Sequence, residues 1–439
     1  METNDSARSE FLREFPKTGP DTRAGKMLRH YWHPVCLSRD LNDLPYGVRM
    51  LGEDLVAFRG LDGIVGLVGM RCPHRCTSLE YGQIREQGLQ CSYHGWTFDH
   101  RGHCVAMPLE RAGSRAMGQI SHLWYPVEEW GGVVWCYMGA DKHNPPPLPK
   151  IDILTRTDGE IILDRGDFRN YNYLNFLENF ADIGHSYVLH MLVPGTVPDD
   201  MRPYCNFTVN TDWRQLGFHV IETHFGMKSV VIHGTSDPEL KYVNTWSIAL
   251  PTHWRFGGIT AGLAPDFTAD RRESGGMLRI IDDTHFEIFR YTLLRSGNFR
   301  GSYFPQGSNV KRGVVVDRGT VVKKDYDYRK YPAWEGRPPL EDLVMQEMQG
   351  AIPPRETEHL VSTDVGVALL RRIWRKSMDD VAKGKAPKAV ITDSEGVVEV
   401  DTFKGFAKAG EIEIGPKNMP SSKGNQGLIR DEQGRLVFA

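Results

Sequence analysis

The chain has 439 residues, of which 40% are hydrophobic and 25% are charged, and its formal net charge is −3. This length allows two or three domains with a sizeable core, and the composition is that of an ordinary soluble globular protein. The slightly acidic balance argues against nucleic-acid binding as the main function, and no apolar run is long enough to span a bilayer.

The N-terminal stretch METNDSARSEFLREF is charged and lacks the apolar core of a signal peptide. The seven cysteines form an odd and scattered set. Such a set favours reduced thiols and metal ligation over a disulfide framework. We therefore expect a cytoplasmic protein.

Residues 1–45 are predicted to form a helical lead-in, because AGKMLRHYWHPVC carries apolar residues at helical spacing. Over residues 46–150, short apolar runs such as GIVGLVGM alternate with glycine-rich turns, which predicts an antiparallel β domain. The run NPPPLPKID disrupts both helix and strand and marks a domain boundary.

Residues 151–385 are predicted to form an α+β domain. A helix is expected over 170–192, then several strand-like runs, then helices over PPLEDLVMQEMQGAI and VALLRRIWRKSMDDVAKG. Residues 386–439 are rich in Lys, Gly and Pro, with weak strand patterns. We expect this C-terminal extension to be peripheral.

The stretch RCPHRCTSLEYGQIREQGLQCSYHGWTFD contains two Cys/His pairs, Cys72 with His74 and Cys91 with His94. Zinc accepts such a ligand set, but zinc fingers usually group their ligands as a Cys pair and a His pair. One Cys and one His from each of two loops suit a [2Fe–2S] cluster in which one iron takes both Cys and the other takes both His. A zinc site is the alternative.

The spacing C-x-H … C-x-x-H, continued by YHGWTFD, resembles the Rieske motif of Rieske oxygenases. Cys76 stands where many of these oxygenases have Gly. Respiratory Rieske proteins join their two loops by a disulfide. The second loop here, CSYHGW, has no second Cys, so Cys76 has no partner for such a disulfide. We interpret Cys76 as a small apolar filler beside the cluster.

The stretch NYLNFLENFADIGHSYVLHML places Asp182, His185 and His190 close together in sequence. Asp182 and His185 are three apart and share a helix face, whereas His185 and His190 would point roughly 140° apart in a regular helix. Both His can reach one metal only if the helix ends, bends or carries a π-bulge there, and we predict such a distortion. Two His and one carboxylate form the facial triad of non-haem Fe(II) oxygenases, whereas two buried core His are the alternative.

The resemblance implies roles for further residues. About residues 25–385 resemble the phthalate dioxygenase-like and dehydrodivanillate O-demethylase-like branch. In that branch, the residue matching Asp182 bridges an iron-bound His to a Rieske His of the neighbouring subunit. The third iron ligand then maps onto Asp342 in PPLEDLVMQEMQG, with Glu341 and Glu347 as competitors.

The same resemblance implies a fold and an activity. The fold is an N-terminal antiparallel β Rieske domain followed by a helix-grip-like catalytic domain with a central antiparallel sheet. The activity is that of a terminal oxygenase with a [2Fe–2S] cluster and a mononuclear Fe(II), acting on O2 and a small aromatic substrate. An aryl carboxylate is the expected substrate, oxidised by O-demethylation or ring hydroxylation, and a homotrimer is the expected assembly.

The electron donor is expected to be a separate NAD(P)H reductase or ferredoxin, because no G-x-G-x-x-G opens a βα unit in this chain. A substrate carboxylate would favour a nearby cation, but surface ion pairs are the expected role of the four candidates Arg214, Lys228, Arg255 and Arg290. The competing hypotheses are a Rieske ferredoxin-like electron carrier without oxygenase activity and a zinc-stabilised interaction module.

Overall fold

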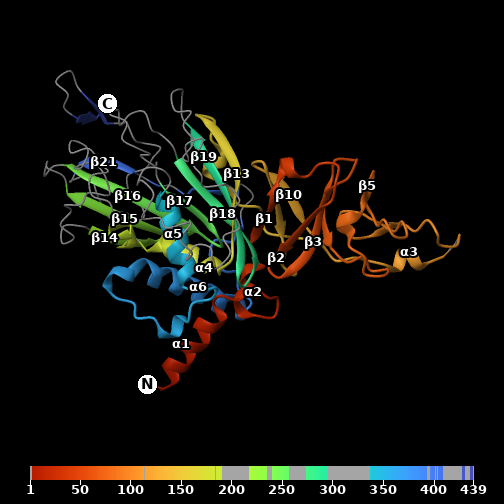
Figure 1. Ribbon diagram of the computed structural model, residues 1–439, viewed down its shortest axis with the longest axis horizontal. Helices are drawn as coiled ribbons and strands as arrows, with labels where there is room; N and C mark the ends of the chain where they lie inside the picture. Colours follow the sequence, from red (N-terminus) through yellow and green to blue (C-terminus); the bar gives the residue numbers. More distant parts are fainter. Residues whose placement is uncertain are drawn as a thin grey trace.

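The computed structural model describes residues 2–112, 114–182, 184–189, 217–234, 240–256, 273–294, 337–392, 396–400, 402, 404–408, 428–430 and 436–438. Figure 1 shows a β-rich N-terminal part at one end and a large sheet with helices packed on one of its faces at the other. The fold is α+β, as predicted. None of the helices in the described ranges is long and apolar enough to cross a membrane.

The N-terminal β part contains three small antiparallel sheets within the described residues. The first is formed, in spatial order, by β1 (Trp32–Leu37), β11 (Val133–Tyr137) and β10 (Val127–Trp130). The second is formed by β2 (Tyr46–Met50), β3 (Glu53–Arg59), β4 (Val65–Gly69) and β9 (Trp124–Tyr125). The third is formed by β5 (Gln83–Arg85), β6 (Gly88–Gln90), β7 (Thr97–Phe98) and β8 (Cys104–Ala106), and a short helix, α3 (Ala116–Gln119), follows.

Local chemistry explains the β2–β3 hairpin. Met50 pairs with Glu53, so the loop has only Leu51 and Gly52. Both have positive φ, 46° and 85°. A two-residue loop with positive φ at both positions matches the twist of the flanking strands, and glycine adopts this conformation without strain.

The large sheet is antiparallel, with strand order β13-β19-β18-β17-β16-β15-β14, and β21 also pairs with β16. The strands are β13 (Glu160–Arg169), β14 (Gly217–Glu222), β15 (Gly226–Gly234), β16 (Leu240–Ala249), β17 (His253–Phe256), β18 (Glu273–Asp282), β19 (His285–Leu294) and β21 (Lys404–Lys408). Nearly every residue of β18 is buried, so both faces of the sheet are covered at this strand.

In the described ranges, five α-helices lie outside the β part: α1 (Glu2–Glu14), α2 (Arg23–Leu28), α4 (Tyr173–Ala181), α5 (Arg337–Met348) and α6 (Val365–Ala382). One face of the sheet packs on α4, where Phe176 contacts Trp254 and Phe286. The other face packs on β1, β11 and the linker after them, with Phe289 and Tyr291 in that second core. The sheet therefore joins the N-terminal β part to the helical layer.

The ends of the chain differ from expectation in two places. Residues 1–45 include α1 and α2, but Trp32–Leu37 forms a strand that pairs with β11. The C-terminal extension is less peripheral than predicted, because β20 (Val397–Val398) pairs with β12 (Lys150–Ile151) and Val400 is fully buried. A separate hairpin is formed by β22 (Leu428–Arg430) and β23 (Leu436–Phe438).

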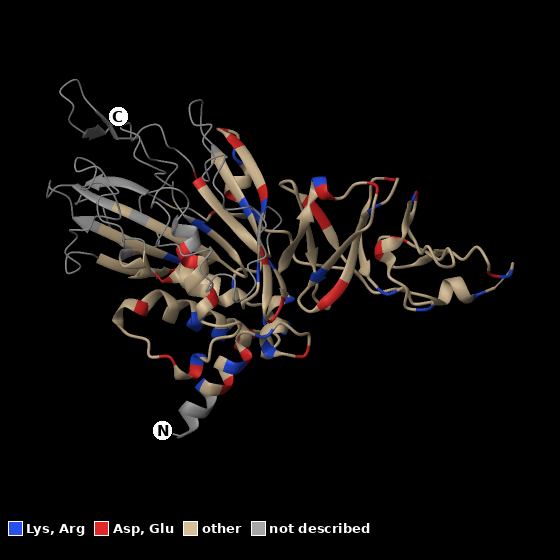
Figure 2. Cartoon of the chain, viewed as in Figure 1, with Lys and Arg blue, Asp and Glu red and all other residues tan. Residues whose placement is uncertain are grey.

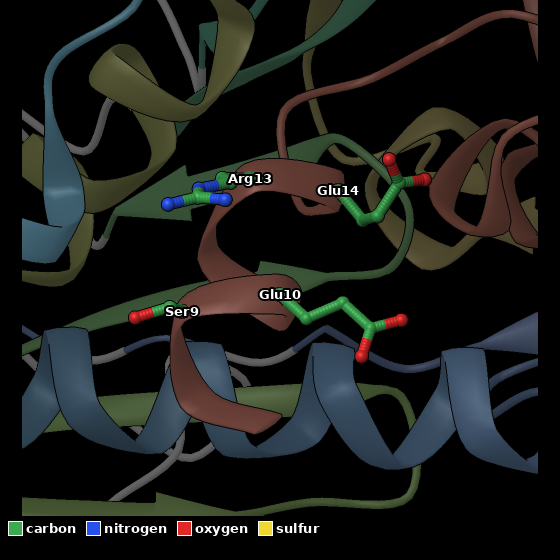
Figure 3. A pocket seen from close by; sticks show the side chains of 4 residues that line it. All are labelled: Ser9, Glu10, Arg13 and Glu14. Atoms are coloured by element: carbon green, nitrogen blue, oxygen red, sulfur yellow. The ribbon is translucent and has the colours of Figure 1, made fainter. Parts of the chain in front are cut away.

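Acidic and basic side chains are interspersed over the described chain (Figure 2). A hollow at the surface of α1 is lined by Ser9, Glu10, Arg13 and Glu14 (Figure 3). Glu14 in this hollow accepts a hydrogen bond from the backbone N–H of Arg23, 3.3 Å away. These four residues belong to a helix that carries none of the predicted metal ligands, so we assign the hollow no chemical role.

Candidate metal centres

Two loops of the N-terminal β part carry the first ligand set and have the same local geometry. In the first loop, the N–H of Cys76 donates to the carbonyl of Cys72 at 2.8 Å. In the second, the N–H of Gly95 donates to the carbonyl of Cys91 at 2.9 Å. Cys76 and Gly95 both have left-handed backbone, with φ of 58° and 75°. Each cysteine therefore begins a tight turn that brings the following His back toward it.

Cys76 itself is exposed. The interpretation of this residue as a small apolar filler is therefore wrong. Its position is set by the turn, which needs a left-handed residue four places after Cys72, and the side chain points to solvent. Glycine fits this position without strain, which gives a physical reason for Gly at the matching place in the resembling oxygenases.

The four predicted ligands come together as two pairs. The thiols of Cys72 and Cys91 are buried and in hydrogen-bond contact with each other. The rings of His74 and His94 lie 4.5 Å apart, and His74 stacks on Trp96 with centroids 4.4 Å apart. Trp96, which sequence reasoning did not single out, thereby fixes the orientation of one imidazole.

The electrostatics of these pairs suit metal ligation. Burial raises the pKa of the Cys72 thiol to about 11, while backbone N–H groups of His74 and Arg75 donate to its sulfur and partly oppose that rise. Metal binding would release this proton. The Nδ1 atom of His94 is buried and has no hydrogen-bond partner within the described residues. A metal ion bound here would supply the partner that this nitrogen lacks.

The geometry groups the four ligands as the two irons of a cluster would need them. The thiols of Cys72 and Cys91 contact each other, and the rings of His74 and His94 lie side by side. A Cys pair and a separate His pair are the ligands that the two irons of a Rieske cluster require. The first set therefore fits a [2Fe–2S] cluster.

The second ligand set begins where α4 ends. α4 stops at Ala181, and Gly184–Tyr187 forms a separate 3-10 turn. The Oδ1 atom of Asp182 accepts from the N–H of Gly184 at 2.8 Å, so this side chain satisfies backbone that the helix would otherwise use. The predicted helix over 170–192 is therefore shorter than expected, because it ends before His185. The distortion expected between His185 and His190 stays a prediction, because His190 lies outside the described residues.

His185 lies between two carboxylates on opposite sides of its ring. Its Nδ1 atom is 3.7 Å from Oδ2 of Asp182, and its Nε2 atom is 3.3 Å from Oδ1 of Asp342. Burial lowers the pKa of His185, but hydrogen bonding and charge from Asp182 and Asp342 outweigh it and raise that pKa to about 10. Nε2 of His185 and Oδ1 of Asp342 thus face each other, as two ligands of one metal ion would.

Asp342 therefore stands apart from its two competitors. Asp342 lies in the interior of α5, on the Nε2 side of His185. Glu341 and Glu347 are both buried, with 1% and 3% of their surface exposed. The described contacts of His185 include Asp182, Asp342 and Ser186, whose Oγ lies 3.4 Å from Nε2.

The cationic residues considered for substrate binding differ in their burial and ion pairing. Arg255 is fully buried and pairs with Asp152 at 2.9 Å and with Glu273, so the prediction of a surface ion pair is wrong for this residue. Its Nη1 atom also donates to the carbonyl of Val400 at 2.7 Å. Lys228 and Arg290 are partly buried on β15 and β19, and Arg214 lies outside the described residues.

Comparison with known proteins agrees with this geometry. A model of the Rieske [2Fe-2S] domain matches residues 31–126. The chain is 39% identical over 401 residues to the phthalate 4,5-dioxygenase oxygenase subunit of Pseudomonas putida, covering 86% of this chain and 87% of the relative. The chain belongs to the Rieske non-haem iron oxygenases.

This Rieske oxygenase has relatives with different named substrates. It is 29% identical over 436 residues to the tert-butanol monooxygenase / tert-amyl alcohol desaturase oxygenase subunit of Aquincola tertiaricarbonis, covering 97% of this chain and 87% of the relative. Its fold matches that of NdmB from Pseudomonas putida CBB5 with a TM-score of 0.59 at 20% identity, covering 83% of this chain and 96% of the other. As a Rieske oxygenase, the chain uses a [2Fe–2S] cluster and a mononuclear iron.

Proposed function

We propose that this Rieske oxygenase is the terminal component of a multicomponent system that oxidises an aromatic carboxylate with O2, by O-demethylation or ring hydroxylation. The observation that carries this proposal is the position of His185, which lies between Asp182 and Asp342 at the broken end of α4. A Rieske electron carrier has no use for such a site.

The two geometries support the ligand assignments, and for His190 the support is the sequence spacing alone. Cys72 and Cys91 hold one iron of the cluster, and His74 and His94 hold the other. The mononuclear iron is held by His185, His190 and Asp342, the two His and one carboxylate typical of non-haem Fe(II) oxygenases. Together the two centres supply single-electron storage and reductive activation of O2.

Asp182 serves this site from the side opposite the metal. Its carboxylate faces Nδ1 of His185, so it holds the proton on that nitrogen and leaves the Nε2 lone pair directed toward Asp342. Stacking on Trp96 holds the His74 ring in one orientation at the first centre. Both residues thus fix imidazole geometry without being ligands.

The two centres lie in different parts of the chain. Figure 1 shows the sheet that contains β5 at one end of the molecule, and α4 and α5 toward the other. Tyr81 and Tyr93 are exposed on the segment that contains the cluster loops, and Val188 is exposed three residues after His185, with 62% of its surface accessible. Two different patches that bind each other head to tail generate a ring when the rotation between copies closes. We infer a homotrimer in which the cluster of one copy serves the iron of the next.

The substrate class rests on the relatives. The relative with the higher identity is named for phthalate, an aryl dicarboxylate, and the more distant one for tertiary alcohols. Electrons come from a separate reductase or ferredoxin, because the relatives are named as oxygenase subunits. A cytoplasmic location would supply NAD(P)H to that reductase and keep the cysteines reduced.

The test is reconstitution with a surrogate reductase. The chain should contain one iron beyond the pair in the cluster, and it should consume O2 in the presence of phthalate or a methoxybenzoate, releasing a cis-diol or formaldehyde. The oxygenase would be rejected in favour of the electron carrier if all iron were in the cluster and electrons were transferred without substrate-dependent O2 uptake. Turnover of a tertiary alcohol alone would reject the aromatic substrate while keeping the oxygenase.

A further inference from the structure

A buried carboxylate, Glu178, lies one turn before the end of α4, between two guanidinium groups. Its Oε2 atom accepts from Nε of Arg355 at 2.9 Å, and its Oε1 atom accepts from Nε of Arg371 at 2.5 Å. Arg371 also donates to Glu358 at 2.6 Å, and Arg355 to Asn175 at 3.1 Å. These five side chains form a cluster, which we call the Glu178 cluster.

The Glu178 cluster connects three parts of the helical layer. Glu178 belongs to α4, Arg371 belongs to α6, and Arg355 lies in a 3-10 turn, Arg355–Thr357, that follows α5. Asn175 of α4 also donates to the carbonyls of Gln346 and Gly350 at 3.2 and 3.1 Å, and Gln346 belongs to α5. The helix that leads to His185 and the helix that carries Asp342 are thus held to each other next to the cluster.

A backbone hydrogen bond connects Glu178 to Asp182. The N–H of Asp182 donates to the carbonyl of Glu178 at 2.9 Å, which is the final hydrogen bond of α4. Asp182 then directs the turn to His185. A displacement of Glu178 would therefore be passed to the end of α4 and to His185 beside Asp342.

We propose that Glu178 is a positioning residue for the mononuclear iron: the two arginines hold its carboxylate, and through it they fix the distance between His185 and Asp342. This inference rests on the proposed function, since it assumes an iron at that site. Glu178 touches neither the metal nor the substrate.

The charge state of the cluster suits this role. Burial raises the pKa of Glu178, but Arg355 and Arg371 outweigh the burial and hold that pKa below its ordinary value. Glu178 and Glu358 balance the two arginines. In Glu178→Gln the side chain keeps its shape, yet the two guanidinium groups lose the charge that draws them to α4.

The sheet offers a matched control. Glu287 of β19 is also a buried carboxylate between two arginines, Arg165 at 2.7 Å and Arg279. Arg279 reaches the carbonyl of Val35 on β1, on the face of the sheet away from α4. Glu287→Gln therefore removes the same charge from the same kind of cluster, with no connection to His185.

The test measures Fe(II) binding to the cluster-loaded protein after mild chelation has removed the mononuclear iron. We expect Glu178→Gln to weaken Fe(II) binding about tenfold or more and to alter the EPR spectrum of the nitric oxide adduct of the ferrous site. The Rieske EPR signal should stay unchanged. Glu287→Gln should lower the melting temperature comparably but bind Fe(II) as the wild type does.

Wild-type affinity in Glu178→Gln, or equal weakening in both variants, would overturn the inference. If Glu178→Gln does not fold, Glu178→Asp keeps the charge but is one methylene shorter. We then expect weakened Fe(II) binding from Glu178→Asp, and unchanged binding would overturn the inference. A wild-type protein that binds no Fe(II) outside the cluster would instead refute the proposed function.

Discussion

At the scale of single residues, the two cluster loops show how a backbone angle decides what a position needs. Cys76 and Gly95 occupy equivalent places, each accepting left-handed backbone four residues after a cysteine ligand. One loop uses glycine there and the other uses a residue with a Cβ atom. The left-handed conformation costs a residue with a Cβ roughly 1–2 kcal/mol.

Cys76→Gly should therefore stabilise the protein by about 1 kcal/mol without changing the cluster. The measurement is thermal unfolding of the cluster-loaded protein, followed by the visible absorption of the cluster. Cys76→Ala is the control, because it removes the thiol and keeps the Cβ atom. Equal stabilisation by both variants would show that the thiol, and not the backbone, is responsible.

The candidate ligands that could be identified from the sequence are those that lie close together along the chain. Cys72, His74, Cys91 and His94 stand in two short loops, and their pairing can be read from the order of letters. Glu178 could not be recognised in this way, because its partners Arg355 and Arg371 lie 177 and 193 residues further along the chain. The local sequence gives only its place in the predicted helix, four residues before Asp182.

At the scale of elements, the end of α4 depends on how closely α6 approaches it. A Cβ atom added to Gly366 of α6 would lie 2.1 Å from the carbonyl oxygen of Ala181. No heavy atoms can be that close, so only glycine allows this crossing of the two helices. Ala181 is the last residue of α4 and directly precedes Asp182.

Gly366→Ala should push the end of α4 away from α6 and cost about 2 kcal/mol of stability. It should also reduce the iron bound outside the cluster, because His185 moves with that end. The measurements are chemical denaturation and metal analysis. Gly118→Ala is the matched control in helix α3, where an added Cβ meets no atom within 4 Å. Normal iron content in Gly366→Ala would show that the site tolerates displacement of α4.

Helical periodicity alone extended α4 too far. The apolar pattern continues beyond Ala181, so it predicted a helix over 170–192, although the spacing of His185 and His190 already required a break. The structure supplies the physical cause, since the Asp182 carboxylate takes the backbone N–H of Gly184. Side-chain competition of this kind depends on the local conformation and is not visible in hydrophobic spacing.

At the scale of the whole molecule, the α+β class and the antiparallel sheets could be predicted, because alternating short apolar runs and glycine turns are local signals. The strand Trp32–Leu37 was missed, because its partner β11 lies about a hundred residues later in the chain. The buried state of Arg255 was missed for the same reason: Asp152, 103 residues earlier, neutralises it.

Electron transfer between subunits can be tested with mixed oligomers. Cys91→Ser removes the cluster from one version of the chain, and Asp342→Ala removes the mononuclear iron from another. Each version alone should be inactive. The mixed trimer is isolated by purification on two tags. It should show about one third of wild-type turnover, since one of its three head-to-tail contacts joins an intact cluster to an intact iron site.

The control for this experiment is a mixture of the two versions purified separately and combined without exchange, which should stay inactive. Inactive mixed oligomers that retain both metal centres would show that electrons do not pass between copies of this chain.

The backbone of Val400 lies between two buried charged side chains: its N–H donates to Asp152 at 3.0 Å and its carbonyl accepts from Arg255. A chain shortened at the end of α6 would remove both hydrogen bonds from this buried ion pair. Protein engineers who wish to truncate this oxygenase should therefore keep the chain at least through Val400.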